Sequence, residues 1–358
     1  MNIAIRVDAS KKIGMGHLAR CQNLAERLIA KNCKVTFVCR DFGDTFLRRI
    51  SRSLFDVIVL PSPSKADTRA ATSNPGSHGD WLATNWEEDA KQTSEALSTC
   101  EKLDWLVVDH YGIDISWQRV MRSLAKGIFV IDDLADRQMD CELFLDQSYF
   151  GTDRDRYTAL LPTGCKRFIG PQNMLLGKEF GAAPKRSPDQ PVKRILVSFG
   201  GTDPRGLSSE VIDRLHAFLP PSVKIDLAVG GGNQQADALR KYGKRENTSV
   251  YIDPLNLANL IRSADLGIGC GGVTALERAA MLLPSLAIAA ADNQEESLQH
   301  MDRLGLARLI TSLHDIEKIV KEMLRFGTFP VPRLVTDGTD RIVSTLLSYN
   351  PKAMPQGA

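Results

Sequence analysis

The first thirty residues constrain the fold more than any other part of the chain. The largely apolar run 3–7 ends in Asp8, and a turn containing Gly14 and Gly16 leads into a segment whose apolar residues recur every three or four positions. This order predicts a β-strand, a glycine loop and an α-helix that packs one face on a sheet. The free N–H groups at the start of such a helix form an anion site.

A histidine stands in the first turn of that predicted helix. The positive end of the helix dipole disfavours an imidazolium at His17, and a neutral imidazole can accept a proton at neutral pH. His17 is therefore a candidate general base. We also predict that Asp8, directly after the preceding strand, is a catalytic residue. Glycine turns and first-turn histidines also occur for purely structural reasons, so this string alone does not decide between the two interpretations.

Short β-rich runs alternate with helical patterns along the whole chain, which is typical of parallel sheets covered by helices. The strands expected in the first half are 3–7, 35–39, 57–60, 105–108, 128–131 and 143–145. Those expected in the second half are 195–198, 225–229, 250–252, 266–268 and 286–289. We therefore predict an α/β fold with two Rossmann-like domains that face each other across a cleft.

Two polar stretches interrupt this alternation. Residues 184–191 have the proline-rich composition of a linker, which sets the expected domains at 1–183 and 192–358. Residues 61–80 form either a long loop over the site or a surface excursion, and their composition favours the second.

Composition narrows the class of protein. The chain has 358 residues, enough for two domains, and its net charge of +2 favours neither nucleic acid nor an anionic membrane as partner. It has no basic leader and no run of the roughly 18 apolar residues that span a bilayer. Its seven cysteines include no Cys-x-x-Cys pair, which favours buried reduced thiols over disulfides or zinc ligands. We expect a cytoplasmic monomer.

Polar side chains follow three of the expected strands in the first half. The string Asp-His-Tyr-Gly occupies 109–112, an Asp pair follows at 132–133, and Asp-Gln follows at 146–147. Because ligands bind beyond the carboxyl ends of the strands in such sheets, these groups are expected to line one wall of a cleft. Carboxylates at strand ends also cap the helices that follow, and we expect this of one residue of the 132–133 pair.

The second half carries glycines at two strand ends. The string Phe-Gly-Gly-Thr-Asp at 199–203 follows a strand and leaves its backbone free to approach the expected interdomain cleft closely. The string at 269–277 leads from a strand into a helix. There Gly271, Gly272 and Thr274 can offer N–H and hydroxyl donors to a diphosphate. Glu277 lies one turn on, where a carboxylate can bind both hydroxyls of a ribose. Glu277 also has the spacing of a capping box with Thr274. The sequence alone favours neither the ribose-binding role nor the capping role.

Taken together, these strings resemble a known enzyme family. The segments 6–10, 14–20, 109–112, 200–203 and 271–294 resemble those of the pseudaminic acid pathway enzymes that hydrolyse a UDP-linked 2,4-diacetamido-2,4,6-trideoxy sugar. That family is similar in fold to the two-Rossmann-domain, GT-B-like UDP-sugar glycosyltransferases. The chain departs from the family pattern at Lys178, where arginine is common, and at Ser148, where asparagine is common, which affects the finer sugar contacts.

The resemblance implies roles for single residues. It makes Tyr111 the partner of His17 in orienting the attacking water, assigns Glu277 to the ribose, and puts the Asp-Asn-Gln string at 292–294 near the phosphates and the sugar. The candidate substrate-binding residues are Gly14, Gly16, Arg20, Asp109, His110, Gly200, Gly201, Thr202, Gly271, Gly272, Thr274, Glu277, Asn293 and Gln294.

A mechanism follows from these assignments. UDP is a good leaving group, so catalysis consists of placing a water and stabilising the charge of the departing diphosphate. We expect attack at the anomeric carbon with inversion, and no cofactor or metal. Two alternatives stay open on the sequence: a glycosyltransferase of the same fold in which His17 acts on an acceptor hydroxyl, and a sugar-nucleotide binding module without catalysis.

Overall fold

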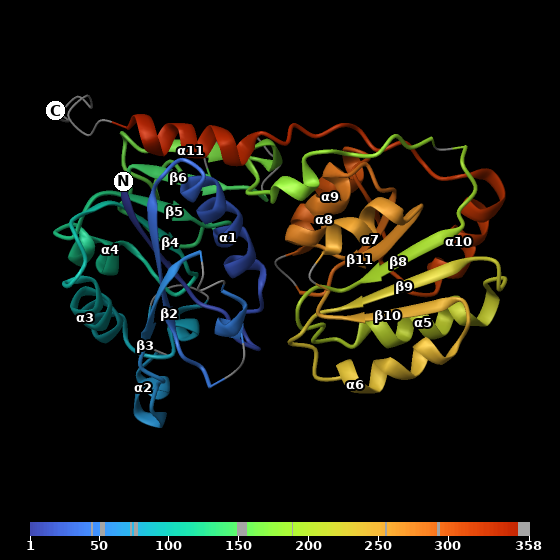
Figure 1. Cartoon of the computed structure of the whole chain (residues 1–358), viewed down its shortest axis with the longest axis horizontal. Coiled ribbons are helices and arrows are strands. Elements are labelled where there is room, and N and C mark those ends of the chain that lie inside the picture. Colours follow the sequence, from blue (N-terminus) through green and yellow to red (C-terminus); the bar gives the residue numbers. More distant parts are fainter. Residues whose placement is uncertain are drawn as a thin grey trace. The chain divides into compact units, whose positions relative to one another are not determined.

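The computed structural model describes residues 1–43, 46–50, 54–71, 74, 78–148, 156–187, 189–254, 256–291 and 294–349. The chain divides into two compact units (Figure 1). Unit 1 comprises Met1–Leu175 and Asp337–Ala358, and unit 2 comprises Leu176–Thr336. Each unit is a parallel sheet with helices on both faces, so the predicted α/β fold with two Rossmann-like domains is confirmed.

Unit 1 contains, in its described part, a seven-stranded sheet in the order β3-β2-β1-β4-β5-β6-β7. All neighbouring strands pair in parallel. The strands are β1 (Asn2–Val7), β2 (Lys34–Arg40), β3 (Asp56–Leu60), β4 (Leu103–Asp109), β5 (Ala125–Ile131), β6 (Leu143–Asp146) and β7 (Lys166–Ile169). The helices are α1 (Gly16–Ile29), α2 (Lys65–Ala70), α3 (Trp86–Leu97), α4 (Ile115–Met121) and α11 (Gly338–Ser348), with short 3-10 turns such as η3 (Gly79–Leu82). The sequence predicted six of the strands but not β7.

Alternating side chains of this sheet build two separate cores. Ile3 and Ile5 of β1 and Trp105 of β4 pack with helices α1 and α11. Ala4 of β1 and Leu106 of β4 point to the other face and pack with α3 and α4. This period of two is what a strand buried on both faces requires. It also directs Arg6 of β1 toward the face covered by α3.

Unit 2 repeats the topology. Its described part holds a six-stranded parallel sheet in the order β10-β9-β8-β11-β12-β13. The strands are β8 (Arg194–Ser198), β9 (Lys224–Val229), β10 (Thr248–Ile252), β11 (Leu266–Cys270), β12 (Ser285–Ile288) and β13 (Arg308–Leu309). Helices α5 (Leu207–Phe218) and α10 (Asp315–Phe326) contribute to the main core, and α7 (Leu257–Ser263) and α8 (Val273–Ala280) contact β8, β11 and β12. Helices α6 (Ala236–Leu239) and α9 (Glu295–Arg303) complete the unit.

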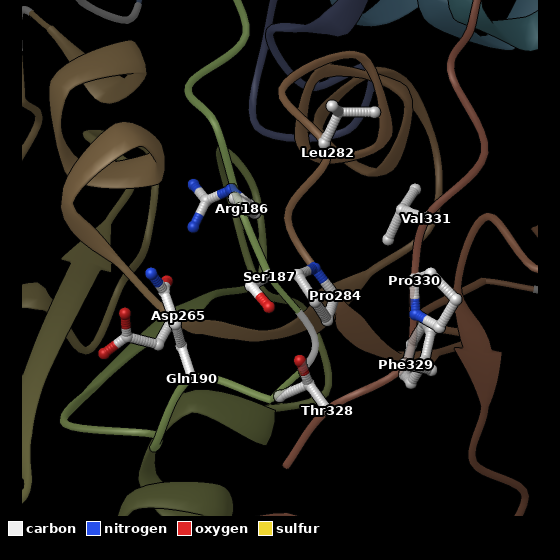
Figure 2. Close-up of a pocket in the computed structure, with 10 residues that line it drawn as sticks. All are labelled: Arg186, Ser187, Gln190, Asp265, Leu282, Pro284, Thr328, Phe329, Pro330 and Val331. Carbon is white, nitrogen blue, oxygen red and sulfur yellow. The ribbon is translucent and has the colours of Figure 1, made fainter.

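The boundary of the units differs from the predicted linker in two places. Helix α11 belongs to unit 1, because Ile342 and Leu346 pack into its core and the indole N–H of Trp105 donates to the Leu346 carbonyl at 3.0 Å. Residues 184–191 belong to unit 2. There Arg186 donates to the carbonyls of Met281 at 3.1 Å and Ile261 at 2.7 Å, beside a small cavity of about 90 Å³ (Figure 2). Charge-assisted bonds to helix ends hold the linker against one unit.

The strand order defines one special point in each sheet. The order reverses between β1 and β4 in unit 1 and between β8 and β11 in unit 2. At such a reversal the loops that follow the two strands diverge to opposite faces, and ligands bind in the crevice that they leave. Most of the described residues that the sequence predicted for the site lie in the loops or helix starts at these two points. None of the helices in the described part of the chain is long and apolar enough to cross a membrane.

Candidate functional site

In unit 1 the strand reversal brings His17 against Asp109. His17 is the second residue of α1, and Asp109 ends β4. The imidazole Nδ1 lies 2.5 Å from Asp109 Oδ1. Nδ1 is also 3.2 Å from the Arg20 guanidinium, but its shorter contact with the carboxylate identifies it as the protonated nitrogen. The lone pair of the ring therefore lies on Nε2, which suits a proton acceptor oriented by a carboxylate.

Asp109 is fully buried and has a charged partner. Arg20 donates to both carboxylate oxygens at 2.7 Å from Nε and NH2. Burial opposes ionisation of Asp109, but the charge of Arg20, followed by that of His17, outweighs it and holds the pKa of Asp109 below its usual range. Asp109 and Arg20, both predicted as substrate ligands, are therefore engaged with each other and with His17.

Tyr111 is brought beside His17, as the resemblance implied. The two ring centroids are 4.5 Å apart and the rings meet edge to face. The hydroxyl of Tyr111 donates to Asp133, which also accepts a bond of 3.0 Å from Ser148 Oγ. Burial, followed by the negative charge of Asp133, raises the pKa of Tyr111 well above its usual value. The phenol stays protonated at neutral pH and its proton is committed to Asp133.

Asp8 and His110 lie beneath this group in a buried charge network. Both oxygens of Asp8 accept from Arg6, at 2.5 and 2.9 Å, and Oδ1 also accepts from the Arg40 N–H at 2.7 Å. His110 Nδ1 accepts from the Gly112 N–H at 3.0 Å, which leaves its proton on Nε2, 3.2 Å from Asp8 Oδ2. Asp8 has no exposed surface. It therefore holds other side chains and, in this structure, has no access to a substrate.

The network continues to helix α3. Asp89 accepts from Arg6 and from Arg40, each at 2.7 Å, and from the indole of Trp117 at 2.9 Å. Two arginines and two aspartates thus balance one another inside the fold, and a buried charge without such partners would be strongly destabilising. This network fixes the carboxyl ends of β1 and β4, where the candidate base is attached.

The remaining acids of the predicted wall have local partners. Asp132 accepts from the Leu134 N–H at 3.0 Å and from Arg137 at 2.5 Å, so it closes a turn; the expected helix cap is not formed, because residues 132–142 contain no helix. Asp146 accepts from the Tyr157 hydroxyl at 2.6 Å. Burial, followed by the charge of Asp133, raises the pKa of Asp146 to about 7. Asp132 and Asp146 therefore bind neighbouring side chains and backbone groups around Asp133.

Residues of the polar stretch reach the candidate base, which composition did not favour. Helix α2 is a largely exposed excursion within that stretch, but the end of the stretch at 78–80, with Trp81 directly after it, returns to the site. The Trp81 ring lies 5.2 Å from that of Tyr111 and 6.1 Å from that of His17, and the His78 ring lies 4.6 Å from Trp81. A histidine within the polar stretch and a tryptophan directly after it were the signal that could have identified these two residues.

The glycine loop of unit 1 opens helix α1 without a side-chain cap. Gly14 has φ of +82° and donates to the Ser10 carbonyl at 2.7 Å, which closes the turn. Gly16 is the first residue of the helix, and Met15 before it provides no capping side chain. The first N–H groups of α1 are therefore left for a ligand, as expected for an anion site.

In unit 2 the loop after β8 packs closely on its neighbour. Gly200 has φ of +78°, and a Cβ on Gly230 would lie 2.4 Å from backbone atoms of Gly200 and Gly201. Thr202 is half-buried in this loop. Asp203 caps helix α5 by accepting from the N–H groups of Leu207 and Ser208 at 2.9 Å. The glycines here serve the close approach of two loops.

The loop after β11 opens helix α8. Gly272 has φ of +77°, and no side chain caps the helix, so its first turn, which includes Thr274, keeps N–H groups for an anion. The Gly271 N–H is occupied, because it donates to Gln294 Oε1 at 3.2 Å, and Gln294 also accepts from the Ala290 N–H at 3.0 Å. Gln294 thus joins two strand-end loops. The predicted site residue Asn293 and its neighbour Asp292 lie outside the described residues.

Glu277 is buried on α8 and has no partner among the residues that the structure describes. It is 8% exposed, and its carboxylate forms no hydrogen bond or ion pair with any described residue. Helix α8 begins at Val273, so Thr274 lies inside the helix and the alternative of a capping box is not formed. Burial raises the pKa of Glu277 to about 7, with the positive charge of Arg278 opposing this shift. A buried acceptor of this kind is suited to a ligand with hydroxyl groups.

In the part of the chain that the structure describes, no group of three or more His, Cys, Asp and Glu side chains is arranged to hold a metal ion. The Cys141 and Cys165 sulfurs lie 3.7 Å apart, and all seven cysteines are free thiols.

No family model matches the chain, but curated proteins do. The chain is 24% identical over 311 residues to the UDP-2,4-diacetamido-2,4,6-trideoxy-beta-L-altropyranose hydrolase of Campylobacter jejuni, covering 85% of this chain and 97% of that protein. It is 23% identical over 359 residues to the spore coat polysaccharide biosynthesis protein SpsG of Bacillus subtilis, covering 94% and 95%. An uncharacterized protein of Methanocaldococcus jannaschii is 23% identical over 314 residues, and the chain spans 57% of its length.

Solved structures match the fold. MurG of Acinetobacter baumannii aligns with a TM-score of 0.61 at 12% identity, covering 97% of this chain and 99% of that one. UGT89C1 of Arabidopsis thaliana, complexed with UDP, aligns with a TM-score of 0.62 at 12% identity, covering 97% and 99%. The chain therefore has the two-Rossmann-domain fold of GT-B glycosyltransferases. The resemblance seen in the motifs is confirmed, because similarity to the hydrolase extends over most of the chain.

Proposed function

We propose that the protein hydrolyses a UDP-linked 2,4-diacetamido-2,4,6-trideoxy sugar at the anomeric carbon, releasing UDP and the free sugar with inversion. The reaction would provide a free sugar for the biosynthesis of nonulosonates such as pseudaminic acid. The observation that carries the proposal is the contact of 2.5 Å between His17 Nδ1 and Asp109 Oδ1. It turns Nε2 away from Asp109, so that this nitrogen is the one placed to accept a proton from water, at the point of unit 1 where the fold binds ligands.

Tyr111 supplies the second half of this arrangement. Because its proton goes to Asp133, the phenol oxygen keeps its lone pairs for a hydrogen bond from water. A water that donates one proton to Tyr111 and the other to His17 Nε2 is held in one orientation. Ser148, at a position where the resembling family commonly has asparagine, supports this by donating to Asp133. The departure from the family pattern thus retains a donor to the acid that orients Tyr111.

Unit 2 supplies the groups for the nucleotide. Glu277 is a buried carboxylate with no partner among the described residues, and a ribose offers two hydroxyls that can donate to it. The uncapped start of α8 offers N–H groups to a diphosphate. The similarity to the Campylobacter hydrolase and the fold of UDP-binding glycosyltransferases support uridine diphosphate as that ligand.

The chemical steps balance without a further reactant. The water oxygen bonds to the anomeric carbon as His17 Nε2 takes its proton, and the bond from that carbon to the glycosidic oxygen breaks. Its electron pair leaves with the diphosphate, whose charge the N–H donors of the helix starts stabilise. The imidazolium then releases its proton to solvent. We propose that no cofactor or metal takes part and that a monomer suffices.

The test is to incubate the protein with this UDP-sugar and no acceptor, and to follow both products by proton NMR. We expect UDP and free sugar to form in equal amounts, with the sugar appearing first as the anomer opposite to the substrate. The His17→Asn variant should bind the substrate without turning it over, whereas His314→Asn, which changes an exposed histidine of unit 2, should act as the wild type.

Two results would overturn the proposal. Sugar transfer that begins only when an acceptor is added would indicate the glycosyltransferase alternative. Binding of the UDP-sugar with neither hydrolysis nor transfer would indicate a binding module.

A further inference from the structure

Four rings gather around the candidate base. Trp81 and Tyr111 lie 5.2 Å apart and are tilted by 32°, close to an offset stack, while His17 meets Tyr111 edge to face. His78 contacts both Trp81, at 4.6 Å, and Tyr111, at 5.3 Å. Trp81 is half-buried and takes part in none of the hydrophobic cores of the described residues. Its packing partners are the rings of the site, so filling the core does not account for it.

The segment that carries Trp81 is held firmly. Asn74 is buried, and its amide nitrogen donates to the carbonyls of Gly79 at 3.0 Å and Thr84 at 2.7 Å, while its oxygen accepts from the Trp86 N–H at 3.0 Å. A Cβ at Gly79 would lie 2.5 Å from the Asn74 carbonyl oxygen, so the backbones touch. One side chain thus closes the segment 79–86 on itself.

Two further contacts attach this segment to the catalytic loops. A Cβ on Gly112 would lie 3.1 Å from the Gly79 carbonyl oxygen and from the Leu82 nitrogen, so the Asp-His-Tyr-Gly string packs against the segment. Lys12, in the glycine loop that precedes α1, forms an ion pair with Asp80. The position of Trp81 is therefore coupled to both loops that carry the base and its partner.

The surface that these rings present is apolar. The hydroxyl of Tyr111 is directed to Asp133 and its ring is buried, so the half-buried ring of Trp81 is the part of this wall that a ligand reaches first. Ring faces carry partial negative charge and attract C–H groups, whereas they leave a hydroxyl without a hydrogen-bond partner. Methyl groups are the substituents that such a wall accommodates best.

We propose that Trp81, with Tyr111 and His78, forms a subsite that binds the methyl-bearing face of the sugar, through its N-acetyl groups or the methyl group at C6. The inference rests on the proposed function for the identity of the sugar. It makes Trp81 a specificity residue that selects acylated deoxy sugars over fully hydroxylated ones. Placing such a sugar against Tyr111 also presents its anomeric carbon to the water that His17 activates.

The experiment separates binding from catalysis by using the inactive His17→Asn background. Affinities for UDP, for the UDP-diacetamido-trideoxy sugar and for UDP-glucose are measured by titration calorimetry, with Trp81 intact, Trp81→Phe or Trp81→Leu. We expect Trp81→Leu to weaken binding of the methyl-bearing substrate roughly 3- to 10-fold, the size of one aromatic contact, and to leave UDP and UDP-glucose unchanged. Trp81→Phe should restore most of the loss, and Trp86→Phe serves as the control.

An equal loss of affinity for all three ligands would overturn the subsite, because it indicates a structural role. Unchanged affinity for the methyl-bearing substrate in Trp81→Leu would overturn it as well. A different result would overturn the proposed function but not the subsite. In that case the protein with its wild-type His17 would release no UDP from the substrate, while Trp81→Leu would still weaken binding of the methyl-bearing substrate selectively.

Discussion

The two strand reversals of this molecule share a topology but carry different chemistry. In unit 1 the reversal between β1 and β4 is filled with charged and aromatic side chains that bind one another, among them His17, Asp109 and Arg20. In unit 2 the reversal between β8 and β11 is built from glycine loops and an uncapped helix, and its acid, Glu277, has no partner among the described residues. Both helix starts are uncapped, but the acid of unit 1 is satisfied by side chains of the protein, whereas the acid of unit 2 is left open.

The difference indicates a division of work. A side chain that must take a proton has to be oriented before the substrate arrives, so its partners belong to the protein itself. A group that binds a nucleotide is satisfied by the ligand instead, so it is left unpartnered at some cost in stability.

The first prediction concerns the base of unit 1. His17→Asn should lower kcat by about 10²- to 10⁴-fold, the contribution of a general base, while the Kd for UDP stays within error. Steady-state assays of UDP release, combined with calorimetry, measure both quantities. A variant that keeps more than about a tenth of the wild-type rate would show that proton transfer to His17 is not limiting. A large loss of UDP affinity would contradict the division of work.

The second prediction concerns the open acid of unit 2. Glu277→Ala should weaken UDP binding by about 1.5 to 3 kcal/mol, the range for hydrogen bonds to a charged group. The loss should be absent for a nucleotide analogue that lacks both ribose hydroxyls, because that ligand has nothing to donate to Glu277. Equal losses for UDP and for this analogue would disprove the ribose assignment.

The third prediction uses the ionisation of Glu277. Its pKa is raised from 4.5 to about 7 in the folded chain, so ionisation opposes folding, and stability falls as the pH rises from about 4.5 to 7. Above that range the penalty amounts to roughly 3 kcal/mol as an upper bound, and Glu277→Gln removes it. Thermal melts at pH 8 should therefore show a higher Tm for Glu277→Gln than for the wild type, with little difference at pH 4.5.

The same titration affects binding in the opposite sense. The ionised carboxylate accepts both ribose hydroxyls, so the UDP affinity of the wild type should rise between pH 6 and pH 8 relative to that of Glu277→Gln. Comparison with this variant removes the effect of the nucleotide's own ionisation. A wild type and a variant with parallel pH profiles would exclude Glu277 from the nucleotide site.

The fourth prediction concerns the backbone of the open site. Gly272 has φ of +77° and ψ of −157°, a conformation that is essentially confined to glycine. Gly272→Ala should cost about 1 to 3 kcal/mol of stability through backbone strain, since the nearest atom to the new Cβ is 3.9 Å away. Gly243→Ala, also in unit 2 but without a positive φ, is the matched control. Equal melting temperatures for the two variants would contradict this account of Gly272.

Much of this architecture could be predicted from the sequence. The alternation of strand and helix patterns located eleven strands, and the strand ends then pointed to His17, Tyr111 and Glu277, because parallel sheets expose their ligand sites there. The strands that it missed have a local cause. Strand β7 begins with Lys166 and Arg167, and β13 spans only two residues, so neither forms an apolar run.

Pairing between distant side chains could not be predicted. Asp109 is 92 residues from His17, and nothing in either string indicates which of several acids would bind the imidazole. The role of Asp8 could not be predicted for the same reason. A carboxylate at a strand end can act in catalysis or can bind a buried cation such as Arg6, and the sequence does not distinguish the two roles. Trp81 was missed because it directly follows a polar segment, and the composition of that segment did not indicate that it returns to the site. The return depends on the hydrogen bond from the Asn74 side chain to the Gly79 carbonyl.

The site of bond cleavage tests the central claim most directly. Turnover of the UDP-diacetamido-trideoxy sugar in ¹⁸O-labelled water, without an acceptor and in excess chelator, is followed by mass spectrometry of the UDP. The phosphate oxygens of UDP do not exchange with water, so they record which atom was attacked. If His17 directs water to the anomeric carbon, the UDP released carries no label. UDP heavier by one ¹⁸O would mean attack at phosphorus, and activity that returns only with a divalent metal would indicate a metal-assisted pyrophosphatase instead.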